Sequence, residues 1–411
     1  MKRRTVLAVL GFGVLGAPGC RYWPDDSLRN PCLGGPLPDA LARHALIQTA
    51  WQDIDPTRYW DCHVHLVGDG EPGSDAWINP QARSLLHPLQ YAQRQFYLNA
   101  ACVADSERRS DAYIERLLAL HGDFPAGARF MLLAFDQHYD ERGERVVKFS
   151  PVYTSNEYAA RVAHAYPQAF EWIASVHPYR ADCVPALEWA AVHGARAVKW
   201  LPNAMGMDPA SPLCDRFYQA MARLKLPLLS HAGDEQAVPG GAADDLGNPL
   251  RLRRPLDQGV RVIVAHCGAL GRGIDLDRGP DAPSAPNFEL FARLMVESKY
   301  KGLLFGDISA MTQNNYDAAG LIAILTRADW HARLVNGSDY PLPGVMPLIS
   351  VRHLVRAGLL DEAAAPVLTE VRRYNPILFD FLLKRSLRWR GQGFSPKVFG
   401  SRRVFLSMVT A

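Results

Sequence analysis

The sequence predicts an α/β protein whose main domain is a (β/α)8 TIM barrel. From Tyr59 onward, eight short apolar segments alternate with longer helical patterns, and Gly, Pro, Asp or Asn bounds each apolar segment. Buried parallel strands have this appearance, and eight strand–helix units in succession is the number that a barrel requires. The chain has 411 residues, 48% hydrophobic and 21% charged, a composition typical of globular proteins.

The predicted strands and helices follow one another in regular order. We expect strands at residues 59–67, 129–135, 171–177, 195–201, 226–231, 260–266, 302–308 and 333–337. We expect two helices within 81–121, and single helices at 156–167, 181–192, 214–225, 246–259, 287–300, 315–327 and 346–358. Long loops at 136–153, 232–245 and 268–286 follow predicted strands, so they should shape the catalytic face of the barrel.

The first 20 residues have the pattern of an export signal. Lys2, Arg3 and Arg4 precede an apolar run that is too short for a permanent membrane anchor. The Arg pair resembles a twin-arginine signal. Residues 17–20 resemble a bacterial lipobox, although Leu usually stands where this chain has Ala17. We expect a periplasm-facing lipoprotein attached to a membrane by lipid at Cys20; the alternative is an ordinary cleaved signal and a soluble periplasmic or secreted protein.

The remaining chain divides into three predicted parts. Residues 21–58 form a linker and lead-in segment, with one helical stretch at 38–52. The barrel covers 59–358, and residues 359–411 form a helical extension. The basic stretch 384–390 in this extension is expected on a solvated surface.

Charge and cysteine content narrow the possible partners. A formal net charge of +3 without a basic stripe argues against nucleic acid as a partner. The seven cysteines are scattered, so no disulfide framework can be read from their spacing. Cys62 and Cys267 each adjoin a candidate ligand on a strand, and we expect them to face the surrounding helices as small buried hydrophobes. Oligomerisation remains open.

Several histidines and one acid lie where predicted strands end. His63 and His65 are two residues apart on the first strand, so their side chains share a face. His231 ends the fifth strand, His266 the sixth, and Asp339 follows the eighth. Imidazoles and a carboxylate are typical ligands of a divalent catalytic metal. We expect one or two ions, with zinc favoured, and manganese, iron or cobalt as alternatives.

The same segments resemble the amidohydrolase superfamily, in the amidohydrolase 2 type branch of metal-dependent hydrolases that also includes decarboxylases. Four ordered matches carry the resemblance, which extends over about residues 59–343. They are Asp61-Cys62-His63-Val64-His65, Leu226-Pro227-Leu228-Leu229-Ser230-His231-Ala232-Gly233, Val264-Ala265-His266-Cys267-Gly268 and Gly337-Ser338-Asp339-Tyr340-Pro341.

The resemblance implies a role for each matched residue. His63, His65 and His231 would bind the metal. Asp339 would be both a ligand and the base that takes a proton from metal-activated water. His266 would bind a second metal or hydrogen-bond the polarised oxygen of the substrate.

Three other residues have more than one expected role. Lys199 ends the fourth predicted strand, where some members of the superfamily carry a carboxylated lysine that bridges two metals. It would otherwise bind a substrate anion or pair with an acid. His177 and Arg180 follow the third predicted strand, where they would contact substrate or position a loop.

The leading functional hypothesis is a metal-dependent hydrolase that cleaves a C–N or C–O bond in a small-molecule amide, lactone or ester. The second is a metal-dependent decarboxylase or hydratase acting on a small carboxylated substrate. The third is a lipoprotein that binds a ligand without turnover. Fold alone does not identify the substrate.

Overall fold

The computed structural model describes residues 27–238 and 244–406. The predicted export signal at 1–20 and the predicted lipid attachment at Cys20 lie outside the described residues. No helix within the described ranges is long and apolar enough to span a bilayer.

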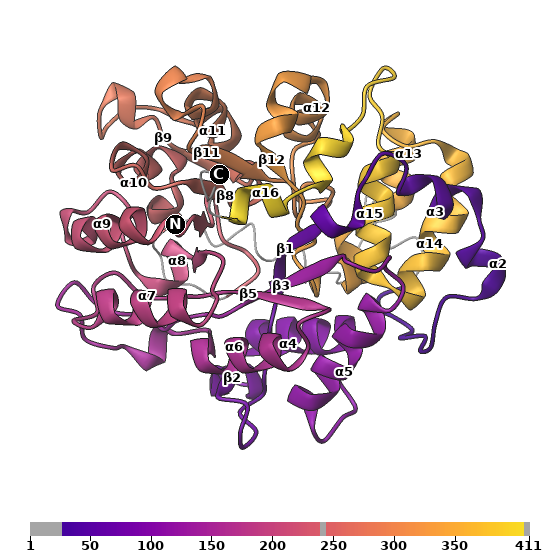
Figure 1. The fold of residues 1–411 in the computed structure, drawn as a ribbon, viewed down its shortest axis with the longest axis horizontal. Coiled ribbons are helices and arrows are strands. Elements are labelled where there is room, and N and C mark those ends of the chain that lie inside the picture. Colours follow the sequence, from indigo (N-terminus) through magenta and orange to yellow (C-terminus); the bar gives the residue numbers. More distant parts are fainter. Residues whose placement is uncertain (1–26, 239–243, 407–411) are drawn as a thin grey trace.

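Eight parallel strands of the described chain form a closed barrel at the centre of the molecule (Figure 1). Two sheets supply them, in the orders β1-β3-β5 and β6-β7-β8-β11-β12. Backbone bridges from Ala174 to Val198 and from Val64 to Tyr340 join these sheets at both edges. The barrel strands are β1 (Trp60–His65), β3 (Arg129–Leu133), β5 (Phe170–Ile173), β6 (Val198–Trp200), β7 (Leu228–Ser230), β8 (Val262–Val264), β11 (Leu304–Asp307) and β12 (Leu334–Val335). The barrel prediction is confirmed, and each strand overlaps its predicted segment.

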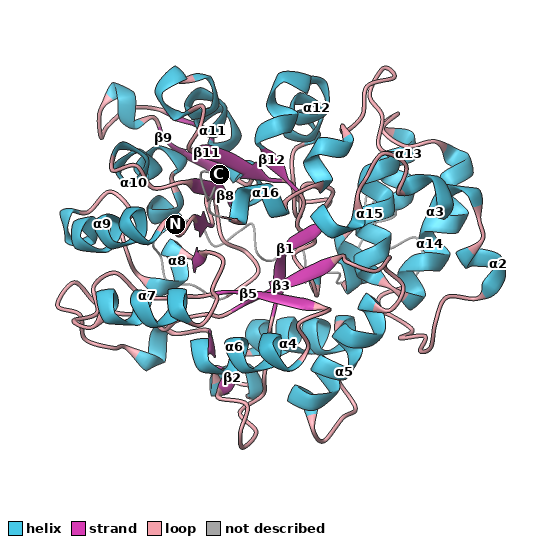
Figure 2. Ribbon diagram, viewed as in Figure 1, coloured by secondary structure: helices cyan, strands magenta, loops and turns pink. Residues whose placement is uncertain are grey.

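Helices surround the barrel (Figure 2). They are α4 (Pro88–Ala100), α5 (Arg109–His121), α6 (Asn156–Ala165), α7 (Cys183–Val192), α8 (Pro202–Met205), α9 (Asp215–Leu224), α10 (Arg253–Asp257), α11 (Asn287–Val296), α12 (Ala318–Thr326) and α13 (Val351–Arg356). Local sequence explains where α6 begins, because the Ser155 side chain caps this helix by accepting a hydrogen bond from the Tyr158 amide. Two antiparallel pairs lie outside the barrel: β2 (Ala76–Ile78) with β4 (Val152–Thr154), and β9 (Arg272–Ile274) with β10 (Ser284–Pro286).

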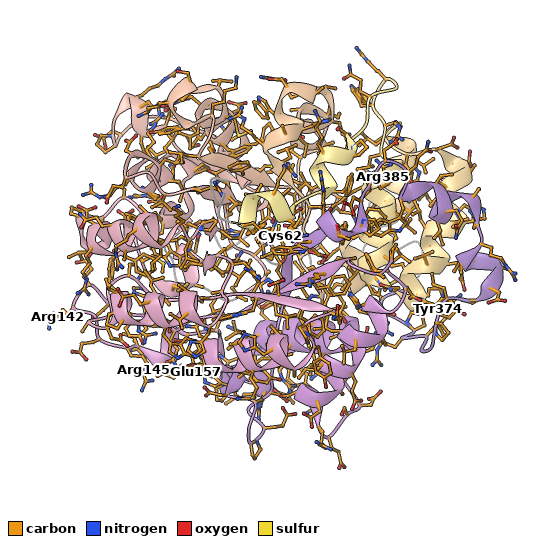
Figure 3. All side chains as sticks on the ribbon, in the orientation of Figure 1. Cys62, Arg142, Arg145, Glu157, Tyr374 and Arg385 are labelled. Carbon is orange, nitrogen blue, oxygen red and sulfur yellow. A yellow bond between two sulfur atoms is a disulfide. The ribbon has the colours of Figure 1, made fainter. Side chains whose placement is uncertain are left out.

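A bulge in β1 corrects the expected orientation of Cys62. Asp61 pairs with Phe130 and Val64 with Leu132, so β1 contains one more residue than β3 over this stretch. The extra residue interrupts the alternation of side chains. Cys62 therefore packs in the barrel interior with Met131, not against the helices, and Figure 3 places it well inside the molecule. Cys267 belongs to the outer core between barrel and helices, as expected.

The lead-in segment and most of the C-terminal extension pack on one side of the barrel, whereas the last described helix lies near the barrel centre (Figure 1). The lead-in segment forms α2 (Asp39–Ala42) and α3 (Ala45–Ala50), and the extension forms α14 (Ala365–Tyr374), α15 (Pro376–Ser386) and α16 (Arg402–Phe405). The Arg385 side chain on α15 donates to the Ala50 carbonyl at 2.7 Å. Val404 and Phe405 of α16 pack into the interior cluster of the barrel.

The position of Lys384 differs from the expected solvated surface. Its side chain is 1% exposed and forms a 2.6 Å ion pair with Asp380, one helical turn earlier on α15. Its ammonium group also donates to the Gly337 carbonyl at 2.6 Å. The helical spacing of an acid and a base allows this lysine to be buried as a paired charge.

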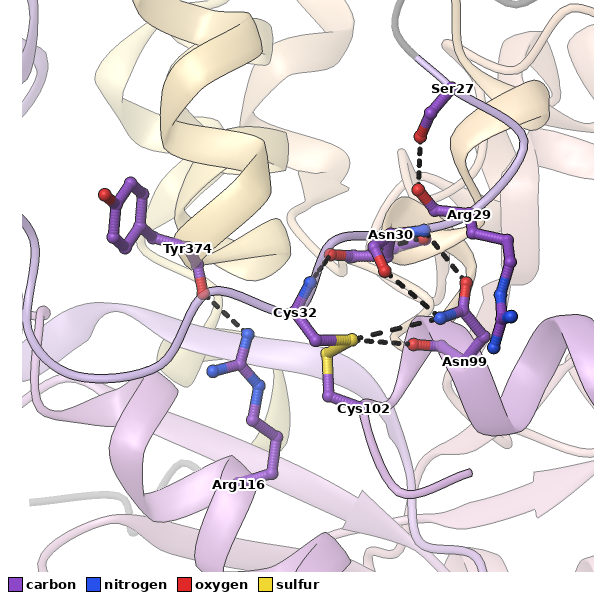
Figure 4. Close-up of a disulfide and its surroundings, with 9 residues drawn as sticks. Ser27, Arg29, Asn30, Cys32, Asn99, Cys102, Arg116 and Tyr374 are labelled. Carbon is purple, nitrogen blue, oxygen red and sulfur yellow. Dashed lines mark hydrogen bonds between the residues drawn. A yellow bond between two sulfur atoms is a disulfide. The ribbon is translucent and has the colours of Figure 1, made fainter. Parts of the chain in front are cut away.

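A disulfide between Cys32 and Cys102 ties the lead-in segment to the end of α4 (Figure 4). The Asn30 amide donates to the Asn99 side chain at 2.9 Å beside it. The two cysteines are 70 residues apart, so only the folded chain shows this pairing.

Candidate metal centre

The barrel brings the histidines and Asp339 to the carboxyl ends of its strands. His63 and His65 end β1, and their ring centroids lie 5.2 Å apart. Asp339 has a φ of 60°, and its amide donates to the His63 carbonyl at 2.8 Å. His266 has a φ of 55°. Non-glycine residues seldom adopt such values, which are more frequent at functional sites.

Asp307 orients the imidazole of His63. The His63 Nδ1–H donates to Asp307 Oδ2 at 2.8 Å, and both side chains are buried. Because a carboxylate only accepts, Nδ1 carries the proton and Nε2 keeps its lone pair. A carboxylate that fixes the tautomer of a histidine in this way is typical of metal ligands.

Asp339 lies among three imidazoles. Its Oδ1 atom is 3.0 Å from His65 Nε2 and 3.3 Å from His63 Nε2. Its Oδ2 atom is 3.8 Å from His266 Nε2. His63, His65 and Asp339 together offer three ligand atoms within 4.8 Å of one another.

Ser309 gives His266 the same tautomer as His63. His266 Nδ1 lies 3.2 Å from the Ser309 carbonyl oxygen and 3.0 Å from its hydroxyl oxygen. The carbonyl only accepts, and the hydroxyl donates to Asp307. The proton is therefore on His266 Nδ1, and Nε2 faces the site with a lone pair.

His231 completes the group and supports a cation site. Its Nδ1 atom lies 3.5 Å from Glu235 Oε2, and its ring centroid is 5.4 Å from that of His266. Its buried Nε2 atom has no hydrogen-bond partner among the described residues. A buried polar atom without a partner is costly, and a cation would provide that partner. This donor set therefore fits a divalent metal ion.

The electrostatics favour neutral imidazoles at His63, His231 and His266 and a charged carboxylate at Asp339. Burial, followed by the charge of Lys199, lowers the pKa of His63 to about 4. Burial also lowers the pKa of His266, and it holds that of His231 well below its usual range. Burial opposes the ionisation of Asp339, but the neighbouring imidazoles hold its pKa well below the usual value. Neutral imidazoles and an ionised carboxylate are the forms that bind metals.

Lys199 lies inside this group. Its Nζ atom is 3.1 Å from His63 Nε2, and the side chain is buried. Burial lowers the pKa of Lys199, although Asp339 and Asp307 oppose the change. The position is compatible with both expected roles, because a bridging lysine and an anion-binding lysine would each face the same ligands.

A cavity of about 370 Å³ opens beside these residues. His63, His65, Lys199, His231, His266 and Asp339 all line it. Its walls also include parts of the loops after β1, β3 and β7, together with α4 and α5. The functional face is therefore the carboxyl end of the barrel.

His177 and Arg180 do not reach the cavity. His177 is fully buried, with Nε2 3.0 Å from the Met205 carbonyl and Nδ1 accepting from the Tyr179 amide. The Arg180 guanidinium pairs with Asp136 and Asp182 at 2.9 and 2.7 Å. Neither lines the cavity, and their contacts position the loop after β5. The structure thus favours the loop-positioning role over substrate contact.

Three supporting residues were not assigned roles from sequence. Asp307, at the end of β11, orients His63, while Ser309 orients His266. Glu235 contacts His231, and burial raises the pKa of its carboxyl to about 7. The sequence signals were weak: an acid at a strand end, a serine two residues later, and a glutamate four residues after a histidine.

Comparisons with known proteins agree with this architecture. A model of the amidohydrolase family matches residues 60–364. A search of curated proteins found no significant match.

Solved structures of similar shape share little sequence with this chain. A TIM-barrel protein from Bordetella bronchiseptica is 16% identical, with 75% of this chain and 99% of that chain covered and a TM-score of 0.48. A probable 2-pyrone-4,6-dicarboxylic acid hydrolase from Acinetobacter baumannii is 13% identical, with coverages of 77% and 96% and a TM-score of 0.42. A 5-carboxyvanillate decarboxylase from Sphingomonas paucimobilis is 13% identical, with coverages of 77% and 97% and a TM-score of 0.42. The family match covers most of the chain, including every barrel strand, and so the protein belongs to the amidohydrolase family.

Proposed function

We propose that this protein is a metal-dependent hydrolase that cleaves a C–N or C–O bond in a small-molecule amide, lactone or ester. The observation that carries the proposal is the buried Asp339 carboxylate, which lies within 3.3 Å of two imidazoles and lines the cavity. A carboxylate held there in its ionised form can act as a base on water beside a bound substrate.

The residues of the site would have different roles in this reaction. His63, His65, His231 and Asp339 would hold a divalent cation, which when bound supplies positive charge that acidifies water and polarises a carbonyl group. Asp339 accepts a proton from the attacking water and delivers it to the leaving group. His266 presents a lone pair at Nε2, so it is suited to binding a cation and cannot donate from that atom while neutral.

We propose zinc as the ion, because imidazole-rich sets with one carboxylate suit zinc. Elemental analysis of the purified protein distinguishes zinc from manganese, iron or cobalt. The same measurement counts the ions: one tightly held ion per chain would exclude the bridging role of Lys199, whereas two would support it.

Replacement of Asp339 tests the reaction. Asp339→Asn should lower kcat by a factor of about 10² to 10⁴ on whichever ester, lactone or amide the wild type hydrolyses. Metal content measured on the same sample separates loss of the base from loss of the ion. Asp329→Asn, at an exposed acid outside the cavity, is the control and should retain full activity.

The binding hypothesis predicts a different result. If the metal-loaded wild type hydrolyses no member of a broad panel of esters, lactones and amides, and Asp339→Asn leaves ligand binding unchanged, the hydrolase proposal is wrong. A non-catalytic ligand-binding role then follows.

Lys199 favours a lyase as the second candidate. Its buried amine faces the cavity beside His63 and could hold the carboxylate of a substrate during decarboxylation or hydration. Release of carbon dioxide from a carboxylated substrate, without hydrolysis of any ester, lactone or amide, would establish the lyase.

We also propose that the protein is exported. The Cys32–Cys102 disulfide supports an oxidising compartment, because cytosolic thiols are normally kept reduced. Mass spectrometry of the mature N-terminus tests attachment to a membrane: a diacylated Cys20 would establish the lipoprotein, and an unmodified start after a cleaved signal would establish a soluble form.

A further inference from the structure

Three arginines surround one carboxylate near the cavity. Arg83, Arg94 and Arg109 lie 3.1, 2.5 and 3.0 Å from the side chain of Asp69. Asp69 is on the loop that follows β1, four residues after His65. Arg94 lies in α4, and Arg109 is the first residue of α5. This arginine cluster is separate from the histidine group.

Two of the three arginines face the cavity. Arg94, Arg109 and Asp69 line it, whereas Arg83 does not. The cavity that contains the histidines therefore also contains two guanidinium groups on its helical wall. A single small molecule could contact both sets of residues.

The cluster has more positive charge than its own acids neutralise. Asp69 Oδ2 is shared by Arg94 and Arg109, and Oδ1 contacts Arg83. The nearby Glu71 carboxylate binds the backbone amides of Arg109 and Ser110 instead of a guanidinium. Even when Glu71 is counted with Asp69, three guanidinium groups outnumber two carboxylates, which leaves one positive charge.

Hydrogen-bond donors also remain unused. The Arg94 side chain is 9% exposed, and its buried Nε atom has no partner within the described part of the chain. The same is true of Arg109 Nε. Guanidinium groups recognise carboxylates through paired N–H donors, and such charge-assisted bonds are strong where water is excluded.

Apolar side chains also line this part of the cavity. Ile78, Leu98, Val103, Phe135 and Leu342 line the space that Arg94 and Arg109 share with the histidines. A ligand that crosses the cavity would place an apolar body against these side chains. One excess positive charge matches one carboxylate better than a doubly charged phosphate.

We propose that Arg94 and Arg109 form a subsite for a carboxylate, so that the substrate is an acid with an apolar body whose reacting bond lies at the histidine group. This inference rests on the proposed function, because it places the substrate of that reaction in the same cavity. The competing explanation is that both arginines only neutralise Asp69 and hold α4 and α5 together.

Equilibrium binding to the full-length, metal-loaded protein tests the subsite. The probes are straight-chain dicarboxylates from glutarate to sebacate and the monocarboxylates of the same chain length, measured by isothermal titration calorimetry. The monocarboxylate keeps a carboxylate for the metal and has none for the arginines. The best-fitting diacid should bind about ten to a hundred times more tightly than the monocarboxylate of equal length, as expected for charge-assisted hydrogen bonds.

Matched variants separate the two explanations. Arg94→Met should abolish the preference for the diacid and leave the affinity for the metal-bound monocarboxylate unchanged. Arg83→Met removes an arginine that contacts Asp69 from outside the cavity, so it should keep the preference. If Arg94→Met does not fold, Arg109→Met decides, because its side chain is 31% exposed and its loss is less disruptive.

Three results would overturn the inference: no preference in the wild type, a preference that survives both cavity variants, or an equal loss in Arg83→Met. The assay needs no turnover. A protein that prefers the diacid but hydrolyses nothing would refute the proposed function alone, and an active hydrolase without the preference would refute the subsite alone.

Discussion

Replacement of Lys384 by methionine should destabilise this protein far more than replacement of an ordinary surface lysine. Lys384 and Asp380 are 1% and 2% exposed and lie 2.6 Å apart on α15. Methionine has a similar length and fills the space, but it leaves the Asp380 carboxylate buried without its partner. Removing one member of a buried ion pair costs about 3–5 kcal/mol in the free energy of unfolding.

A second contact adds to this cost. The Lys384 ammonium also donates to the Gly337 carbonyl at 2.6 Å, two residues before Asp339. Loss of that bond leaves a buried carbonyl unsatisfied and loosens the support of the Asp339 loop. The structure therefore predicts that the loss in free energy of unfolding lies in the upper part of this range and that metal binding becomes weaker.

Urea denaturation of the full-length protein, followed by circular dichroism, measures the change. Lys299→Met is the matched control: Lys299 pairs with Asp257 at 2.9 Å but is 57% exposed, so its loss should cost less than about 1 kcal/mol. The double replacement Lys384→Met with Asp380→Leu should recover most of the stability, because it removes the stranded charge.

The pH dependence gives a further check on Asp380. Burial raises its pKa to about 6 even with Lys384 present, and removal of the lysine should raise it more. A folded-state pKa above the unfolded value means that stability is lost as pH rises through the folded pKa. The deficit of Lys384→Met relative to the wild type should therefore be small below about pH 6 and grow as pH rises above the wild-type pKa of Asp380. Equal costs for the Lys384 and Lys299 variants, or a deficit independent of pH, would refute the reasoning.

Other predictions concern the metal centre and the disulfide. Asp307→Asn should weaken metal affinity about 10- to 100-fold in chelator competition, because the tautomer of His63 is no longer fixed; unchanged affinity would contradict the role of Asp307. In the metal-free protein, burial lowers the pKa of His63 to about 4, so its contribution to stability is complete above about pH 6.5 and is lost as pH falls toward 4. Thermal melts over this range should show a loss of about 3 kcal/mol in the wild type, and His63→Gln should not show it. Reduction of Cys32–Cys102, which closes a loop of 70 residues, should lower the free energy of unfolding by about 4 kcal/mol, and equal stability of the Cys32→Ser variant would argue against this.

The sequence predicted the barrel well because the spacing of apolar residues and the order of the segments can be read locally along the chain. The eight apolar segments needed only their own composition and neighbours to be recognised as buried strands. Its errors came from features that depend on two segments at once. The face on which Cys62 lies depends on the register between β1 and β3, and a single extra residue changes it. The burial of Lys384 depends on how α15 packs under the β12 loop.

The residues of the site also differ in whether sequence alone could identify their roles. His63, His65, His231, His266 and Asp339 could be found from sequence because each lies at or near the end of a predicted strand. The choice between substrate contact and loop support for His177 could not, since it depends on the carbonyl of Met205, 28 residues away.

By itself, the sequence determined the strand–helix alternation and the residue types available where each strand ends, because these follow from composition and spacing along the chain. Only the tertiary structure decided which nitrogen of each imidazole is free, which acid orients it, and which arginines share the cavity with it. Those properties arise from contacts between residues that are distant in sequence, and such contacts exist only once the barrel has closed.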